Sequence, residues 1–501
     1  MSKKKTPSIF KNRKEAALFP ASFIIALIFF IWQRKFFSWD FSVYVMNAEA
    51  VFKGFYFEWL RAPLASLIMI PFTFLSRQIT IYAFTIIITI FYFHSLKLFH
   101  DKFLAKYNHS EIFYLIAISP FILNFGLGVG TELLSLTLII LFLTYAFSYS
   151  SFIFLGLAML TRYSNVVLLP LVFFQKNIKK ILLGLLILLL VFFPWFIINY
   201  FGTGHALTSL GDYYALNALE QAKPQAEIGS LFSNLFDIVG FLIPFFILGV
   251  LAVIKNWKKI ENKEKELIYS LLAVIILTTL IYEFNSLRNP RYLFNLSFPI
   301  IYFSFIGAKF ILEKLKGNAS RILKIVLILF FIALAISTFF VMESKARGLD
   351  KEMNLTKQII SKMGTMDNNC TVSSDLWVYF DWQNKPAVPA PFARDIQNQS
   401  QISLMEKEGY NIILFKNSES YQKNLPFISQ LNETQPASII EDNKDYIWLH
   451  NDSVCKQTDK INQTYIDALK SVGEFPQDFT GCDALLLRFK LTKLCRTFPF
   501  L

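Results

Sequence analysis

The feature that most constrains this chain is a series of apolar runs, many of them about 17–24 residues long, separated by short polar segments. Runs of that length can cross the hydrocarbon core of a bilayer as helices. Hydrophobic residues fill 54% of the 501 positions, and 55 positions are Phe. This composition is too apolar for a soluble domain of the same size. The sequence therefore predicts a mainly α protein, a polytopic membrane helix bundle.

About eleven spans are expected, together with one apolar run that does not cross. Residues 62–75 form that run, which is short for a span, so we expect a helix at the outer surface of the bilayer. The pair 151–161 and 163–174 is also short and could be two half-helices that meet at Arg162. The expected spans lie at about 17–32, 79–96, 112–130, 132–148, 151–161, 163–174, 179–200, 231–254, 267–283, 293–312 and 322–342.

The distribution of Lys and Arg supports this topology. The segments expected inside hold twenty of these residues, whereas the outer loops before Glu343 hold nine. Because cytoplasmic loops are enriched in Lys and Arg, we expect a cytoplasmic N-terminus and an extracytoplasmic C-terminus, in the plasma membrane. A cleaved signal peptide is the alternative for 17–32, but no small-residue cleavage site follows that run. The basic residues form no base-reading helix, so no nucleic-acid partner is expected.

A second, polar domain is expected after the last span. Residues 1–342 form the membrane domain, and residues 343–501 hold 18 Lys and Arg against 20 Asp and Glu. Short apolar runs typical of strands alternate there with helical patterns, which indicates an extracytoplasmic α/β domain. The strand-like runs are 370–373, 376–380, 411–415 and 445–449, and the helical patterns are 353–363, 402–408 and 463–471.

All four cysteines lie in this second domain, and an even number confined to one exterior domain indicates disulfides. We expect at least one bond, although three connectivities are open and four free thiols are the alternative. The cysteines are Cys370, Cys455, Cys482 and Cys495.

Several charged residues share the predicted outer side of the membrane, and they stand in a definite order along the chain. The first is an acid directly after the first span, followed by a basic residue near a proline, a second acid and a late pair of arginines. The stretches are Ser38-Trp39-Asp40-Phe41, Arg61-Ala62-Pro63-Leu64, Gly130-Thr131-Glu132-Leu133-Leu134 and Arg288-Asn289-Pro290-Arg291-Tyr292.

Together these stretches resemble the GT-C superfamily of integral-membrane glycosyltransferases, in particular the protein O-mannosyltransferases and the lipid A aminoarabinose transferases. Those families place an acid after the first span, a basic residue before a Pro-Pro-Leu segment and a second acid after the third span. The resemblance covers roughly residues 15–345. Ala62 replaces one proline, Glu132 stands where Asp is common, and Phe41 stands where O-mannosyltransferases usually carry a second acid.

The resemblance implies an enzyme that moves one sugar from a polyprenyl-phosphate donor to a lipid, glycan or protein acceptor at the outer face, with inversion. Asp40 would be the general base, or a ligand of a divalent metal ion together with Glu132. Such a transfer needs a base for the acceptor proton and positive charge on the leaving phosphate. A carboxylate at a low-dielectric boundary can have a raised pKa, and we expect this for Asp40. The residues implied in phosphate binding are Arg61, Arg162, Arg288 and Arg291.

Two functions of other classes stay open. A transporter or flippase of a lipid-linked substrate would place charges at mid-membrane, whereas the acids here cluster at one face. A non-catalytic scaffold would bring no common cavity to Asp40, Glu132 and Arg288. Structural roles are also open for single residues, because Glu132 could cap a helix and Arg61 could extend from an interfacial helix toward water. Glu49 and Glu58 are interpreted as surface acids.

Overall fold

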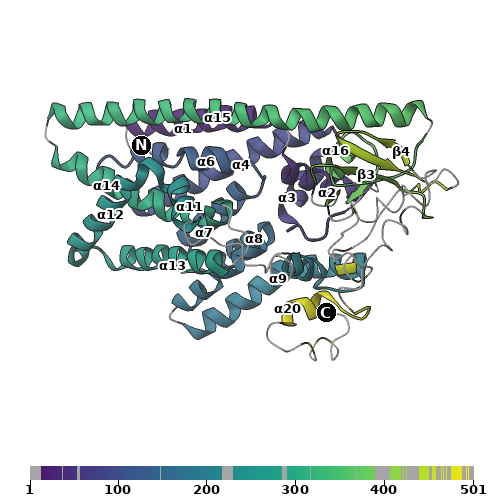
Figure 1. The fold of residues 1–501 in the computed structure, drawn as a ribbon. Helices are drawn as coiled ribbons and strands as arrows, with labels where there is room; N and C mark the ends of the chain where they lie inside the picture. Colours follow the sequence, from purple (N-terminus) through teal and green to yellow (C-terminus); the bar gives the residue numbers. More distant parts are fainter. Residues whose placement is uncertain are drawn as a thin grey trace, which may run out of the picture.

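The computed structural model of the chain describes residues 13–35, 38–53, 57–146, 148–175, 177–216, 230–284, 290–315, 317–366 and 368–389, and beyond them 405, 407–418, 421–422, 425, 439–450, 454–457, 464, 466–467, 470, 476–487, 492 and 495. Figure 1 shows a large helical part, which continues at one end into a small sheet.

Within the described residues, seven helical segments are long and apolar enough to cross a membrane, and the chain is an integral membrane protein. Three shorter apolar helices accompany them: α7 (Glu132–Thr144), α8 (Tyr149–Thr161) and the 3₁₀ helix η3 (Tyr163–Phe174). The long segments are built from α1 (Arg13–Gln33), α4 (Arg77–Phe99) with the π-helical turn η2 (His100–Leu104), α9 (Ile178–Thr203), α11 (Ser230–Val239) with η5 (Gly240–Leu242), α12 (Ile243–Asn256) and η6 (Trp257–Lys259), α13 (Asn262–Phe284), η7 (Pro290–Leu296) with α14 (Ser297–Lys314), and α15 (Asn318–Thr365).

Two apolar runs differ in form from the expected spans. The run at 112–130 is not one helix, because it breaks into α5 (Ile112–Ile116) and α6 (Pro120–Phe125). Pro120 explains the break, since proline cannot donate within a helix but fits its first turn. The run at 62–75 contains the short α3 (Leu64–Met69) and η1 (Ile70–Phe72), so no long helix forms there. The number of spans stays a prediction.

The last span continues without interruption into the second domain. α15 has 48 residues, and its backbone is helical through the predicted boundary at 342 and 343. Figure 1 shows α15 along one edge of the molecule, from the helical bundle to the sheet. A continuous helix is a stiff connection, so the two parts are not joined by a flexible linker.

The C-terminal domain is built on a five-stranded mixed sheet, with the order β2-β1-β3-β5-β4. β1 pairs in parallel with β2 and β3, whereas β5 pairs antiparallel with β3 and β4. The run at 376–380 was expected as a strand but begins the helix α16 (Trp377–Trp382). The described segment at 481–486 is the helix α20 (Gly481–Leu486). Residues 402–404, 406 and most of 463–471 lie outside the described part. The strands are β1 (Val372–Ser374), β2 (Ala387–Pro389), β3 (Asn411–Phe415), β4 (Ile439–Asp442) and β5 (Tyr446–Leu449).

The loop after α1, which was expected as the first outer loop, contributes a helix to the core of this C-terminal domain. Within that loop the chain forms α2 (Trp39–Lys53), whose Val43 and Met46 are buried in one apolar cluster with residues of α15, α16 and the sheet. Trp39 packs edge-on against Trp377, with ring centroids 6.1 Å apart. In Figure 1, α2 lies beside α16 and β3. The position of α2 therefore depends on the C-terminal domain as well as on the membrane helices.

Arg77, the first residue of α4, joins these two parts. Its Nε donates to Oε2 of Glu49 on α2 at 2.8 Å, and its Nη1 donates to the carbonyls of Asp381 and Trp382 at 3.0 and 2.6 Å. Glu49 is fully buried, so the prediction of a surface acid was wrong for this residue. A buried carboxylate needs such a charged partner, and breaking the pair would destabilise the junction by about 3–5 kcal/mol.

Two disulfides join Cys370 to Cys455 and Cys482 to Cys495. The expectation of at least one bond is thereby confirmed. Peptides alkylated without reduction should contain both linkages and no alkylated cysteine when the protein comes from a host with an oxidising exterior. Mass spectrometry of the digested protein measures this directly, and four alkylated thiols would contradict the pairing.

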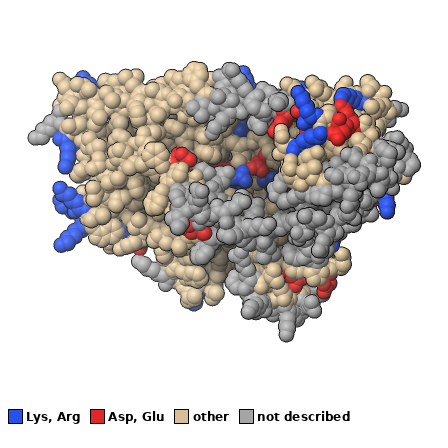
Figure 2. All heavy atoms as spheres, in the orientation of Figure 1, with Lys and Arg blue, Asp and Glu red and all other residues tan. Residues whose placement is uncertain are grey.

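The surface reflects the membrane setting. Figure 2 shows a broad face of the helical part that is nearly free of charged residues. Lys and Arg lie at the left end of the view, and they are mixed with Asp and Glu at the opposite end. Large exposed apolar side chains are frequent on α9, α13 and α15. Exposed apolar side chains on long helices are stable only against lipid or another protein.

Candidate active site

Asp40 lies in the first turn of α2. An acid is favoured there because the helix N-terminus carries a partial positive charge. The preceding turn is fixed to a second loop, since the Ser38 hydroxyl donates to the carbonyl of Gly128 and the Arg34 guanidinium donates to the carbonyl of Leu127. These bonds hold the Asp40 segment against the loop that leads to Glu132.

Two arginines hold the Asp40 carboxylate from opposite sides. Arg61 Nη1 lies 2.7 Å from Oδ1, and Arg291 Nη1 donates to Oδ2. The Asp40 side chain is 18% exposed. Burial alone would raise the pKa of Asp40, but the charges of Arg61 and Arg291 outweigh it and lower the pKa to about 2. The expected raised pKa was therefore wrong, because two guanidinium groups outweigh the low dielectric.

Arg61 itself lies between two carboxylates. Its Nε lies 2.5 Å from Oε2 of Glu58, while its Nη1 faces Asp40. Asn47 on α2 fixes Glu58 by donating to its carbonyl at 3.1 Å and accepting from its N–H at 3.0 Å. Pro63 ends this segment and stands at the N-cap of α3. Glu58 lines the cavity, so the prediction of a surface acid was wrong here too.

Glu132 and Arg162 form the second ion pair of the site. Glu132 begins α7, is 1% exposed, and accepts from Arg162 Nη1 at 3.0 Å. Arg162 has an extended backbone between α8 and η3. This geometry matches the expectation of two half-helices that meet at Arg162. The loop before Glu132 passes close to Phe41, where Gly130 has φ +99° and a side chain would clash with the Phe41 ring.

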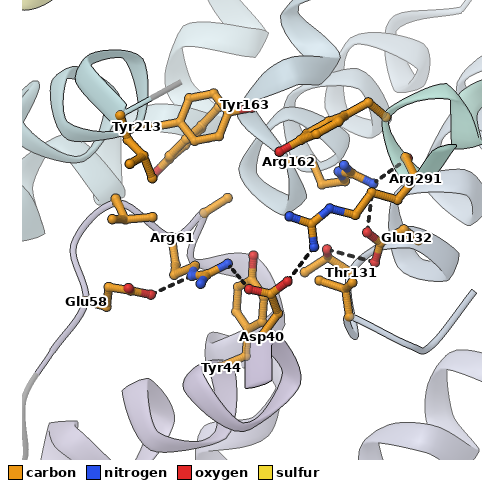
Figure 3. A pocket seen from close by; sticks show the side chains of 15 residues that line it. Asp40, Tyr44, Glu58, Arg61, Thr131, Glu132, Arg162, Tyr163, Tyr213 and Arg291 are labelled. Carbon is orange, nitrogen blue, oxygen red and sulfur yellow. Dashed lines mark hydrogen bonds and ion pairs between the residues drawn. The ribbon is translucent and has the colours of Figure 1, made fainter. Parts of the chain in front are cut away.

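These pairs line one cavity of about 220 Å³. Figure 3 shows Asp40 between Arg61 and Arg291, Glu132 beside Arg162, and the rings of Tyr163 and Tyr213 on the opposite wall. Tyr163 and Tyr213 meet edge-on, with centroids 5.4 Å apart. The lining residues are Asp40, Tyr44, Glu58, Leu60, Arg61, Ala62, Val129, Thr131, Glu132, Arg162, Tyr163, Tyr213, Leu216, Arg291 and Tyr292.

The cavity contains five of the six residues that the sequence indicated. Arg288 lies outside the described residues. Sequence reasoning missed Glu58 and the four tyrosines of the cavity wall. The position of Glu58, three residues before Arg61, was the available signal for an ion pair. The tyrosines gave no usable signal because 17% of the chain is aromatic. The residues brought together are Asp40, Arg61, Glu132, Arg162 and Arg291.

The donor set of the cavity does not fit a divalent metal ion. Each oxygen of Asp40 already faces a guanidinium, and Glu132 faces Arg162 and the Thr131 hydroxyl. A metal ion between these carboxylates would lie next to the guanidinium charges and would be repelled by them. Asp40 and Glu132 are therefore not assigned as metal ligands.

A different group of potential ligands occurs among the described residues. Glu15, His100 and Asp101 offer atoms within 4.8 Å of one another, on α1 and on the π-helical end of α4. The Lys97 ammonium already bridges two of them, at 3.1 Å from Glu15 and 2.7 Å from Asp101. Lys97 thus supplies the positive charge that this group needs.

The fold was compared with known proteins. No family model and no curated protein sequence matches the chain. The structure is similar to the crystal structure of ArnT from Cupriavidus metallidurans bound to undecaprenyl phosphate, with a TM-score of 0.52 and 10% sequence identity. The similarity covers 88% of this chain and 99% of the ArnT chain. The chain therefore shares the fold of ArnT, in agreement with the resemblance to the GT-C superfamily that its sequence motifs indicated.

Proposed function

We propose that the protein is a membrane glycosyltransferase that moves a sugar from a polyprenyl-phosphate donor to a hydroxyl acceptor on the extracytoplasmic side. The observation that carries this proposal is the Asp40 carboxylate, held between Arg61 and Arg291 inside a cavity at the end of an apolar helical bundle. A base and two phosphate-binding groups thereby lie within one small volume.

The donor class is supported by both the fold and the chemistry of the cavity. ArnT, which shares this fold, was crystallised with undecaprenyl phosphate. Arginine binds phosphate oxygens through two parallel hydrogen bonds, and the cavity presents three guanidinium groups. A polyprenyl chain stays in the bilayer, and the exposed apolar faces of the long helices support a donor of this kind.

The ion pairs give Asp40 and its two arginines a coupled role in the reaction. A donor phosphate that accepts hydrogen bonds from Arg61 and Arg291 competes with Asp40 for the N–H groups of these two arginines. The carboxylate then loses part of the positive charge that holds its pKa near 2, and it becomes a stronger base. Phosphate binding thus prepares the base for the step in which it is needed.

The proposed step is a single displacement. The acceptor oxygen bonds to the anomeric carbon, and the bond between that carbon and the phosphate oxygen breaks. The acceptor proton passes to Asp40, and polyprenyl phosphate leaves with the bonding electrons. Arg61 and Arg291 stabilise the charge that develops on the leaving phosphate. Attack opposite the phosphate inverts the anomeric configuration.

Glu132 has a supporting role in this proposal. It is almost fully buried and directs the Arg162 guanidinium, whose Nη1 also lies 3.5 Å from the Arg291 carbonyl. Glu132 and Arg162 thus support the segment that carries Arg291. Arg162 adds a third positive charge to the cavity that receives the phosphate.

The decisive experiment uses purified protein in detergent with a radiolabelled polyprenyl-phosphate sugar and a crude membrane extract as the source of acceptor. We expect release of polyprenyl phosphate and movement of the label to a new product. A flippase would move intact donor across a vesicle membrane, and a scaffold would leave the donor unchanged. Intact donor after incubation with folded protein would contradict the proposed function.

Chelation of divalent metal ions should leave this activity within about twofold of the untreated value. The reason is that guanidinium groups already balance the charges of Asp40 and Glu132. The measurement compares turnover with EDTA, with added Mg²⁺ and with added Mn²⁺. Loss of turnover with EDTA and recovery with one of these ions would contradict the arrangement.

A further inference from the structure

The C-terminal end of the chain packs on one wall of the cavity, far from the sheet to which it is joined. We call the described residues from Thr464 to Cys495 the C-terminal strap. The strap contains α20, and a disulfide joins its residues Cys482 and Cys495. Figure 1 shows α20 beside α9, away from the strands.

The strap makes a close contact with α10 (Thr208–Tyr214), the helix that follows α9. Gly211 of α10 lies directly against the backbone of Gly481, so a side chain at position 211 would meet main-chain atoms. The neighbouring Asp212 is fully buried, and its Oδ1 accepts from the Ile466 N–H at 3.1 Å. Both contacts involve backbone, which fixes the distance between α10 and the strap.

The same contact reaches the cavity. Tyr213 and Leu216 line the cavity, as does Leu60 next to Arg61. Leu60 and Leu216 also pack against an apolar cluster that belongs largely to the strap. Two lining residues therefore have the cavity on one side and the strap on the other. The cluster consists of Ala215, Ile466, Phe479 and Ala484.

The first turn of α10 is attached separately to α9. Oδ1 of Asn199 accepts from the Ser209 N–H at 2.9 Å and from the Ser209 hydroxyl at 2.6 Å. The contact with α9 therefore holds the beginning of α10. The strap packs against Gly211 in α10 and against Leu216, which follows α10. The cavity wall that carries Tyr213 depends on both attachments.

We propose that the C-terminal strap is a positioning element that holds α10 over the cavity and keeps water from the bound donor. This inference rests on the proposed function. A glycosyl donor can react with water in place of the acceptor. A water oxygen bonds to the anomeric carbon, the water proton passes to Asp40, and the bond to phosphate breaks, which yields free sugar and polyprenyl phosphate. A closed wall suppresses this reaction because it excludes water from the site.

The test compares two double variants. Cys482→Ser/Cys495→Ser removes the disulfide of the strap and should loosen α20, and Cys370→Ser/Cys455→Ser is the matched control, because it removes a disulfide of the sheet domain. Both products are measured with labelled donor: free sugar and transferred sugar. We expect the ratio of free to transferred sugar to rise about tenfold in the strap variant and to stay at the wild-type value in the control.

A second variant, Gly211→Ala, separates α10 from the strap while both disulfides stay intact, and it should raise the same ratio. If the double cysteine variant of the strap does not fold, Gly211→Ala still tests the inference. An unchanged ratio in the folded strap variant and in Gly211→Ala would overturn the inference, as would an equal rise in the matched control. Wild-type protein that releases no polyprenyl phosphate would instead refute the proposed function itself.

Discussion

Asp40→Asn should reduce turnover by about 10²–10⁴-fold, which is the usual contribution of a general base. Asparagine keeps the shape of the side chain and can still accept a hydrogen bond from Arg61 or Arg291, but it cannot take the acceptor proton. The loss should therefore fall on the chemical step, and donor binding should change much less. Steady-state kinetics with labelled donor separates the two effects, because kcat falls while KM stays close to that of the wild type.

Asp40→Asn removes both the proposed base and a negative charge beside Arg61, and a matched variant separates these two effects. Glu58→Gln removes a carboxylate from the same cavity and from the same arginine, Arg61, without removing the proposed base. It should cost far less than Asp40→Asn. Near-normal turnover in folded Asp40→Asn, or an equal loss in Glu58→Gln, would remove Asp40 from the role of base.

The residues of this site were predictable from the sequence where a rare residue type stood out from its surroundings. Asp40 follows the first span directly, and Arg162 separates two short apolar runs, where a buried charge is costly without a partner. Sequence alone does not pair such residues. The two members of the pair between Arg291 and Asp40 are 251 positions apart, so only the folded helices bring them together.

Glu49 and Glu58 illustrate why the remainder of the site was missed. Both lie between the first and second apolar runs, in a segment that was expected as a loop, where an acid is usually exposed. Glu49 is instead buried because Arg77 reaches it from α4, and Glu58 faces the cavity because Asn47 fixes its backbone. In each case the environment is set by a partner on another element, and periodicity carries no information about that partner.

The fold, like the site, was predictable from the sequence only in part. Long apolar runs became the expected helices at 17–32, 79–96 and 179–200, since length alone identifies a span. The short apolar run at 376–380 became a helix, because a run of that length fits either a buried strand or a buried helix. The insertion of α2 into the core of the C-terminal domain could not be predicted either, since it depends on tertiary packing.

The shared helix α2 gives the C-terminal domain a role in the chemistry. Asp40 lies at one end of α2, while Val43 and Met46 lie in the core of that domain. The strap of the same domain supports the cavity wall that carries Tyr213. The helix of Asp40, the proposed base, and the opposite wall thus both contact a domain whose described residues include none of the charged residues that line the cavity.

Arg291→Ala should lower kcat/KM by about 10²–10³-fold and should also change its pH dependence. Removal of Arg291 leaves the buried Asp40 with Arg61 as its remaining charged neighbour, so the pKa of Asp40 should rise from its value of about 2. A base acts in its deprotonated form, and activity is lost as the pH falls through its pKa. The acidic limb of the pH profile should therefore move to higher pH in Arg291→Ala, into a range where the wild type keeps full activity.

Arg162→Ala is the control for this shift, because Arg162 pairs with Glu132 and not with Asp40. It should weaken the reaction without moving the acidic limb. Arg291→Lys keeps the charge but loses the paired hydrogen bonds, so it should restore the wild-type pH profile while turnover stays low. The measurement is kcat/KM from pH 4 to 8 for the four proteins, in one detergent and at constant ionic strength. An Arg291→Ala profile with the same shape as that of the wild type across this range would mean that Asp40 is not the base whose proton uptake limits the reaction.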